Sequence, residues 1–172
     1  MKKIIFLDID GVLATDKEFM RNRTKFWEKH PAMGELKVPY PWNENAVKVF
    51  NEILDETDAE IVLTSDWRLH WNLNELKGIF TWNRVKKYPI AVTEDVYIGG
   101  ADLEKTRLNE IEDFIEQNDV NNYVVIDDLN IGKYMALTGN DDKFFITRSS
   151  QGIKQTGLKD KIIKKLNDVV VN

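Results

Sequence analysis

The chain has 172 residues, of which 42% are hydrophobic and 31% are charged, and its net charge is −5. A chain of this length and composition can bury enough apolar surface for one domain with its own core, which excludes intrinsic disorder. It contains no cysteine, which excludes thiol catalysis and zinc held by cysteines. An acidic chain also lacks the overall positive field of a nucleic-acid binder, so we expect no stable binding to duplex nucleic acid.

The apolar runs are too short for secretion or membrane insertion. The first run, residues 4–7, ends at Asp8, whereas the hydrophobic part of a secretory signal needs about 7–15 residues. No other run approaches the roughly 20 apolar residues of a membrane span. We therefore expect a cytoplasmic protein with no membrane partner. The sequence carries no signal for an oligomeric state.

Short apolar runs between polar residues predict strands that are buried on both faces. Three strong runs cover residues 4–7, 61–63 and 123–126, and two weaker candidates cover residues 88–92 and 144–146. Apolar residues at helical spacing lie between them. These are Val47, Phe50 and Leu54 after an expected N-cap at Asn43; Leu69, Leu73, Leu76 and Phe80; Leu108, Ile111 and Ile115 in a helix that begins near Asp102; and Leu158, Ile162, Leu166 and Val169. The alternation predicts an α/β fold with a Rossmann-like open, mostly parallel sheet flanked by helices.

A long segment interrupts this alternation after the first strand. Residues 13–42 separate that strand from the first helix, whereas βα loops usually have about 2–6 residues. We interpret the segment as a small cap inserted into a single domain that spans residues 1–172. Residues 16–30 contain more basic than acidic side chains. This is typical either of a solvated helix face or of a cap that attracts an anionic substrate.

Pairs of carboxylates follow two of the strong strands. Asp8 and Asp10 end the first strand, and Asp127 and Asp128 end the third. Ligands of an open parallel sheet bind outside the carboxyl ends of its strands, so these side chains should meet there. Close carboxylates repel each other unless a cation lies between them, and oxygen ligands without cysteine or clustered histidine favour Mg²⁺. The alternative is that each aspartate merely caps a turn.

Hydroxyl and cationic side chains supply groups that bind a phosphate. Thr64 and Ser65 end the second strong strand, where we expect a helix to start. Hydroxyl and backbone N–H groups at a helix start bind phosphate well, although either residue could instead cap the helix. Lys105 and Arg107 lie in the first turns of the third helix. A cation there opposes the helix dipole, which favours a functional role over a stabilising one. The alternative is an exposed surface charge.

Taken together, these segments resemble the motifs of the haloacid dehalogenase-like (HAD) phosphohydrolases. The four motifs occur in the family's order at residues 5–12 (Ile-Phe-Leu-Asp-Ile-Asp-Gly-Val), residues 63–65, a basic residue within 105–107, and residues 125–128. Three shorter fragments are similar to small-cap HAD proteins associated with nucleic-acid repair. They are residues 64–68, 107–111 and 157–158.

The resemblance implies a role for each carboxylate. Asp8 would be the nucleophile that forms an aspartyl-phosphate, with its second oxygen on Mg²⁺. Asp10 would act as general acid and then as general base, with its backbone carbonyl on Mg²⁺. Asp127 would bind the ion, and Asp128 would bind it directly or through water.

The resemblance also implies the phosphate ligands. Thr64 and Ser65 would hold the phosphoryl oxygens. Either Arg107 or Lys105 would neutralise the charge of the transferred group, and the 107–111 fragment favours Arg107.

The predicted function is that of a Mg²⁺-dependent phosphomonoester hydrolase. Its expected substrate is a phosphorylated small molecule, such as a nucleotide, or a nucleic-acid end. Four aromatic residues near the expected mouth could stack on a base, but such residues more often pack in a core. They are Trp27, Tyr40, Trp42 and Trp67. His30 and His70 have no metal-ligand spacing, so we interpret them as surface or packing residues.

Two other functions fit part of this pattern. A receiver-like signalling module also binds Mg²⁺ and is phosphorylated on aspartate. It needs its acceptor at the end of a middle strand, where we place Thr64 and Ser65. A catalytically silent HAD-fold binding protein would not need both Asp8 and Asp10. Mg²⁺-dependent hydrolysis that is abolished by Asp8→Asn would separate an enzyme from both.

Overall fold

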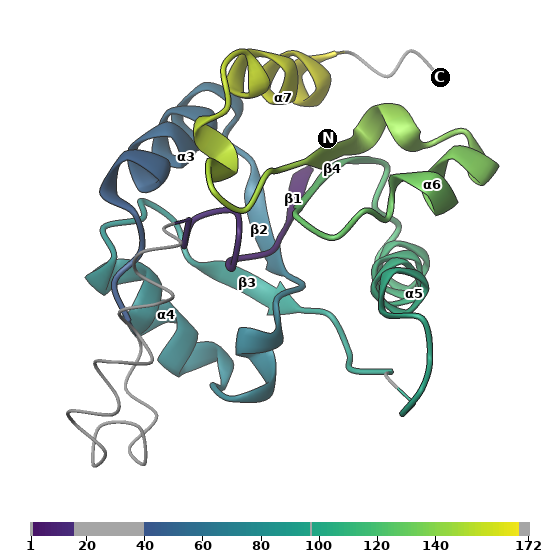
Figure 1. Cartoon of the computed structure of the whole chain (residues 1–172). Helices are drawn as coiled ribbons and strands as arrows, with labels where there is room; N and C mark the ends of the chain where they lie inside the picture. Colours follow the sequence, from purple (N-terminus) through teal and green to yellow (C-terminus); the bar gives the residue numbers. More distant parts are fainter. Residues whose placement is uncertain (1, 16–39, 97, 169–172) are drawn as a thin grey trace.

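The computed structural model describes residues 2–15, 40–96 and 98–168. Its centre is a sheet of five parallel strands in the order β3-β2-β1-β4-β5 (Figure 1). The strands are β1 (Lys3–Leu7), β2 (Glu60–Leu63), β3 (Pro89–Val92), β4 (Asn122–Asp127) and β5 (Phe144–Ile146). The predicted α/β fold and open parallel sheet are confirmed. All five predicted strands are present, although Tyr88 precedes β3.

Helices and short 3₁₀ turns connect the strands. The α-helices are α3 (Glu44–Thr57), α4 (Leu73–Trp82), α5 (Leu103–Gln117), α6 (Gly132–Met135) and α7 (Leu158–Asn167). The 3₁₀ turns are η1 (Asp66–Leu69), η2 (Ala136–Thr138), η3 (Asp141–Lys143) and η4 (Gly152–Lys154). No helix in the described part of the chain is both long and apolar enough to cross a membrane.

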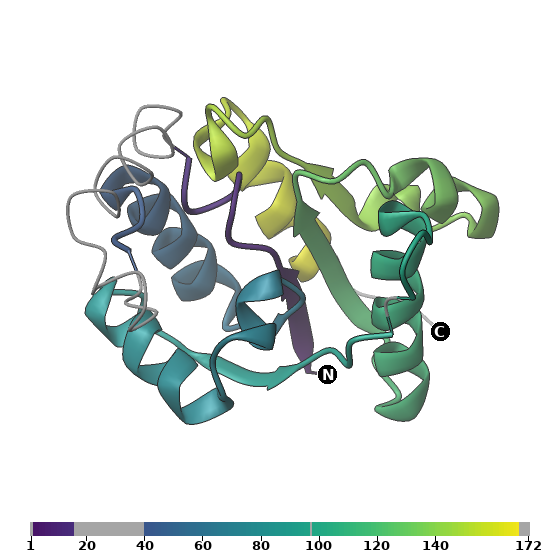
Figure 2. The ribbon, with the colours of Figure 1, turned by 60° about the horizontal axis from the view of Figure 1, so that its bottom comes forward.

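The two faces of the sheet carry separate hydrophobic clusters because neighbouring residues of a strand point to opposite sides. On β1, Ile5 and Leu7 pack with α3, α4 and α7, whereas Ile4 and Phe6 pack with α5 and α6. Figure 2 shows this division of the helices from a second direction. Burial on both faces explains why the strands are continuous apolar runs rather than alternating ones.

Side chains cap three of the helices. Asn43 caps α3, as predicted. Helix α5 begins directly after Asp102, near its predicted start, and the side chain of Asp102 caps it. The predicted start of the second helix is wrong, because Leu69 belongs to η1 instead and is 49% exposed. Helix α4 begins only at Leu73, where Asn72 and Glu75 form a capping box that satisfies the first N–H groups. The predicted position Val169 of the last helix lies outside the described residues.

The two ends of the segment interpreted as a cap lie together. The backbone N–H of Asn43 donates to the carbonyl of Leu13 at 2.9 Å. Residues 16–39, which include Trp27, His30 and the basic stretch, lie outside the described residues. The chain therefore leaves the sheet edge after Leu13 and returns to the same place before α3.

Candidate active site

The acidic side chains gather at the carboxyl edge of the sheet, where β1 and β4 end side by side. Asp8, Asp127 and Asp128 each offer a carboxylate oxygen, and these oxygens lie within 4.8 Å of one another. They line a pocket of about 410 Å³ that reaches to η1 and α5. Three carboxylates at such distances form a set of hard oxygen ligands, which fits a Mg²⁺ ion.

Burial and mutual repulsion raise the pKa of these carboxyl groups. For Asp8, burial raises the pKa well above its ordinary value, the negative charge of Asp127 adds to the rise, and Arg107 opposes it. Burial raises the pKa of Asp127 to about 6, against the lowering effects of Arg107 and of the Leu129 N–H. Burial likewise raises the pKa of Asp128. A divalent cation would stabilise the charged forms that the site otherwise disfavours.

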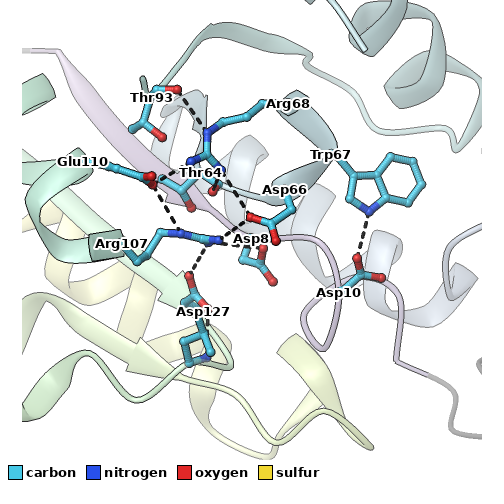
Figure 3. A network of polar contacts seen from close by, with 11 residues as sticks. Asp8, Asp10, Thr64, Asp66, Trp67, Arg68, Thr93, Arg107, Glu110 and Asp127 are labelled. Carbon is cyan, nitrogen blue, oxygen red and sulfur yellow. Dashed lines mark hydrogen bonds and ion pairs between the residues drawn. The ribbon is translucent and has the colours of Figure 1, made fainter. Parts of the chain in front are cut away.

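Arg107 is the cation that the fold brings to these carboxylates. From α5, its guanidinium donates to Asp127 at 3.0 Å and to Asp8 at 3.4 Å, and it also contacts Asp66 at 3.1 Å (Figure 3). Burial alone would lower the pKa of Arg107, but the surrounding carboxylates outweigh it and raise that pKa. The side chain of Lys105 is exposed and does not line the pocket.

A second buried ion pair supports Arg107, and the sequence did not reveal it. Arg68 from η1 pairs with Glu110 of α5 at 2.7 Å, and both side chains are 3% exposed. Glu110 also faces the Nε atom of Arg107 at 3.6 Å, while Arg68 donates to the Thr93 carbonyl at 3.1 Å. The sequence does indicate a contact between Arg107 and Glu110, because residues three apart lie one turn apart on the same face of a helix. Nothing in the sequence paired Glu110 with Arg68.

The hydroxyl groups at the end of β2 do not cap a helix. Thr64 is fully buried, and its Oγ1 atom has no hydrogen-bond partner in the described part of the chain. Ser65 precedes η1 without a side-chain capping bond and lines the pocket. The following turn has four residues rather than a long helix. The Ser65 side chain hydrogen-bonds to Asp8, so of the two hydroxyl groups only that of Thr64 lacks a partner among the described residues. A ligand that hydrogen-bonds to Thr64 would remove the cost of burying a polar group without a partner.

Asp10 lines the pocket but lies outside the group of three close carboxylates. Its carboxylate accepts hydrogen bonds from the Tyr40 hydroxyl and, at 3.0 Å, from the Trp67 indole N–H. Tyr40, Trp42 and Trp67 are at most 8% exposed, so they pack in the fold rather than stand free for a base.

The raised pKa values predict that the metal-free protein loses stability as the pH rises. Well below its ordinary pKa of 3.8, Asp127 is protonated in both the folded and the unfolded chain, so it does not oppose folding. Between its ordinary value of 3.8 and about 6, the folded state holds a proton that the unfolded state has lost. In EDTA, the free energy of unfolding of the wild type should therefore fall, relative to Asp127→Asn, by on the order of 3 kcal/mol from pH 4 to pH 7.

Urea unfolding of both proteins across this pH range measures that difference, and the comparison cancels the contributions of the shared carboxyl groups that do not interact with Asp127. Added Mg²⁺ should restore the stability of the wild type at pH 7 far more than that of Asp127→Asn. If the difference in free energy of unfolding between the wild type and Asp127→Asn does not change with pH, the result would contradict a raised pKa for Asp127.

Gly11 is predicted to be essential for the position of Asp128. Its φ angle is +79°, and an added Cβ would lie 2.2 Å from the Oδ2 atom of Asp128. Gly11→Ala should therefore displace Asp128 and lower Mg²⁺ affinity by about tenfold or more, with about 1–3 kcal/mol of destabilisation. Gly139→Ala is the matched control, because Gly139 has a φ of +69° and open space for a Cβ. Calorimetric Mg²⁺ titration that gives equal affinities for the two variants would contradict this prediction.

The sheet order and the acidic edge define a HAD-type domain. A family model for the HAD domain in Swiss Army Knife RNA repair proteins matches residues 4–158, and the chain belongs to this family. No curated protein and no solved structure matches the chain. The suspected resemblance, including its link to nucleic-acid repair, is confirmed. Membership supports a phosphatase-type hydrolase in general.

Proposed function

We propose that this protein is a Mg²⁺-dependent phosphomonoesterase that removes a terminal phosphate from nucleic acid, with RNA as its preferred substrate. The observation that carries the proposal is the meeting of Asp8, Asp127 and Asp128 within 4.8 Å, beside the buried guanidinium of Arg107. Mg²⁺ would be held by these carboxylates, as the HAD family typically has it, and would supply positive charge to the phosphoryl oxygens.

The residues of the chain would carry out two displacements at phosphorus. An oxygen of Asp8 forms a bond to phosphorus while the ester bond breaks, and Asp10 gives its proton to the leaving oxygen. A water molecule then attacks the phosphorus of the aspartyl-phosphate and gives a proton to Asp10. This step releases inorganic phosphate and restores Asp8. Asp10 ends the cycle as it began, so the atoms and charges balance.

Three further residues would hold the transferred group. The Thr64 hydroxyl, for which the described residues offer no partner, and the Ser65 hydroxyl would donate to the phosphoryl oxygens. Arg107, already hydrogen-bonded to Asp8 and Asp127, would neutralise the charge that these oxygens share in the transition state.

The charge of the pocket lining favours joint binding of the substrate and a cation. Its lining has many more acidic side chains than the two arginines Arg68 and Arg107. A phosphate dianion would therefore be repelled until a divalent cation is present. We propose RNA rather than free nucleotides as the substrate because the family is described as a domain of RNA repair proteins.

A panel of phosphate esters tests this proposal. We expect Mg²⁺-dependent phosphate release from phosphorylated oligoribonucleotides, with a kcat/KM at least about tenfold above that for nucleoside monophosphates or sugar phosphates, and none with EDTA. The panel includes 3′- and 5′-phosphorylated RNA and the matching DNA strands, each with the Asp8→Asn variant as control. Absence of Mg²⁺-dependent release from every ester would contradict the phosphatase, and equal rates on all of them would contradict the RNA preference.

The two alternative functions make different predictions. The position of the strands does not separate a receiver-like module from the enzyme as expected. The central strand of the sheet is β1, whose last residue Leu7 directly precedes Asp8, whereas Thr64 follows β2. A receiver-like module would nonetheless keep its phosphoryl group after one turnover, and a silent binding protein would release no phosphate. Many turnovers per molecule are expected only of the enzyme.

A further inference from the structure

Asp10 has both of its carboxylate oxygens engaged by aromatic residues. Its Oδ1 atom accepts a hydrogen bond from the Tyr40 hydroxyl, and its Oδ2 atom accepts one from the Trp67 indole at 3.0 Å (Figure 3 shows the Trp67 bond). Tyr40 lies just before α3 and Trp67 lies in η1. Two donors from different parts of the fold, one on each oxygen, fix the orientation of this carboxylate.

The two donors are themselves held by aromatic packing. The rings of Tyr40 and Trp67 contact each other at 4.8 Å between centroids, with an angle of 68°. Trp67 also packs against Trp42 and Trp71 at 5.6 and 4.7 Å. The backbone N–H of Trp42 donates to the side chain of Asn83 at the end of α4, at 2.8 Å. Because Tyr40, Trp42 and Trp67 are buried and their rings pack closely, these rings are held in place by the core.

The chemistry of the donors distinguishes the two oxygens of Asp10. An indole N–H can only donate, so Oδ2 stays an acceptor throughout a reaction. A tyrosine hydroxyl can donate or accept. Oδ1 is therefore the oxygen on which a proton can sit, with Tyr40 rotating its hydroxyl to accommodate it.

We infer that Tyr40 and Trp67 are positioning residues that orient Asp10 for proton transfer to and from the leaving oxygen. This inference rests on the proposed function, because it takes Asp10 as the general acid. A correctly oriented acid matters most when the leaving group is a strong base, since such a group must be protonated as its bond to phosphorus breaks. An activated aryl leaving group departs without that proton.

Tyr40→Phe removes a single oxygen atom and leaves the ring packing in place. We expect it to lower kcat/KM for an alkyl phosphate, such as a ribonucleoside 3′-phosphate, by about 10–100-fold. The kcat/KM for 4-nitrophenyl phosphate should fall by less than about threefold. This parameter reports only the steps through departure of the leaving group, so later hydrolysis of the aspartyl-phosphate does not obscure the comparison. Trp67→Phe should show the same pattern.

Three controls accompany these variants. Asp10→Asn should show the same selectivity for the alkyl ester, with a larger loss, and should keep its Mg²⁺ affinity. Adding Tyr40→Phe to Asp10→Asn should cause less than about twofold further loss, because both changes remove one function. Tyr88→Phe, at an exposed residue outside the pocket, should leave both esters unaffected.

The outcomes separate the inference from the proposed function. Equal losses on both esters in Tyr40→Phe, no loss on either, or effects that add to those of Asp10→Asn would overturn the positioning role while Asp10 remains the acid. If Asp10→Asn itself shows no selectivity for the alkyl ester, the proposed role of Asp10 fails and the inference fails with it.

Discussion

Replacement of Asp8 by asparagine is expected to lower kcat for phosphate release by at least about 10⁴-fold. The amide nitrogen and oxygen of asparagine occupy the same space but do not form an aspartyl-phosphate. The same change should stabilise the metal-free protein at neutral pH. Burial raises the pKa of Asp8, so the wild type must either keep a proton there or bury a charge.

Asp95→Asn is the matched control for this variant. Asp95 lines the same pocket but does not belong to the group of three close carboxylates. Asp95→Asn likewise replaces a carboxyl group of the pocket by an amide, and activity should stay within about threefold of the wild type. Phosphate release and thermal unfolding in EDTA measure the two effects. An Asp8→Asn protein that keeps a tenth or more of wild-type turnover would exclude Asp8 as the nucleophile.

The second large effect is expected for Arg107→Met. This change removes the guanidinium but keeps an unbranched apolar side chain of comparable reach. It leaves four carboxylates without their shared cation, namely those of Asp8, Asp66, Glu110 and Asp127. Removing one partner from a buried ionic network costs about 3–5 kcal/mol, so we expect destabilisation of that size together with loss of phosphate release.

Lys105→Met is the control for Arg107→Met and also tests which of the two is the phosphate ligand. Lys105 is exposed on the same helix, so its replacement should change stability by no more than about 0.5 kcal/mol. Urea unfolding with and without Mg²⁺ gives the readout, because the ion should recover part of the stability lost in Arg107→Met. A larger effect on activity from Lys105→Met than from Arg107→Met would reverse the assignment.

The sheet was predictable because its strands are buried on both faces. A strand that is buried on both faces is a continuous run of apolar residues. The run ends where the chain reaches the edge of the sheet and polar residues follow. The acidic residues Asp8 and Asp127 therefore marked the carboxyl ends of two strands. Because those ends meet in space in a parallel sheet, the carboxylate cluster could be predicted from positions more than a hundred residues apart.

The supporting contacts were not predictable, because they depend on tertiary geometry. Trp67 and Asp10 are 57 residues apart, and Tyr40 and Asp10 are 30 apart. No periodicity pairs an indole with a carboxylate. The ion pair of Arg68 and Glu110 likewise depends on the angle between η1 and α5. The error at Leu69 has a local cause, because the capping box of Asn72 and Glu75 fixes the start of α4 at Leu73, even though the leucine spacing continues toward Leu69.

The stereochemical course at phosphorus tests the central claim most directly, because it does not require any intermediate to accumulate. A chiral, isotopically labelled thiophosphate ester is hydrolysed with Mg²⁺ in isotopically labelled water, and the configuration of the released thiophosphate is determined. Transfer to Asp8 followed by transfer to water consists of two in-line displacements, so we predict net retention of configuration. Net inversion would mean that water attacks the ester directly, and it would contradict the account.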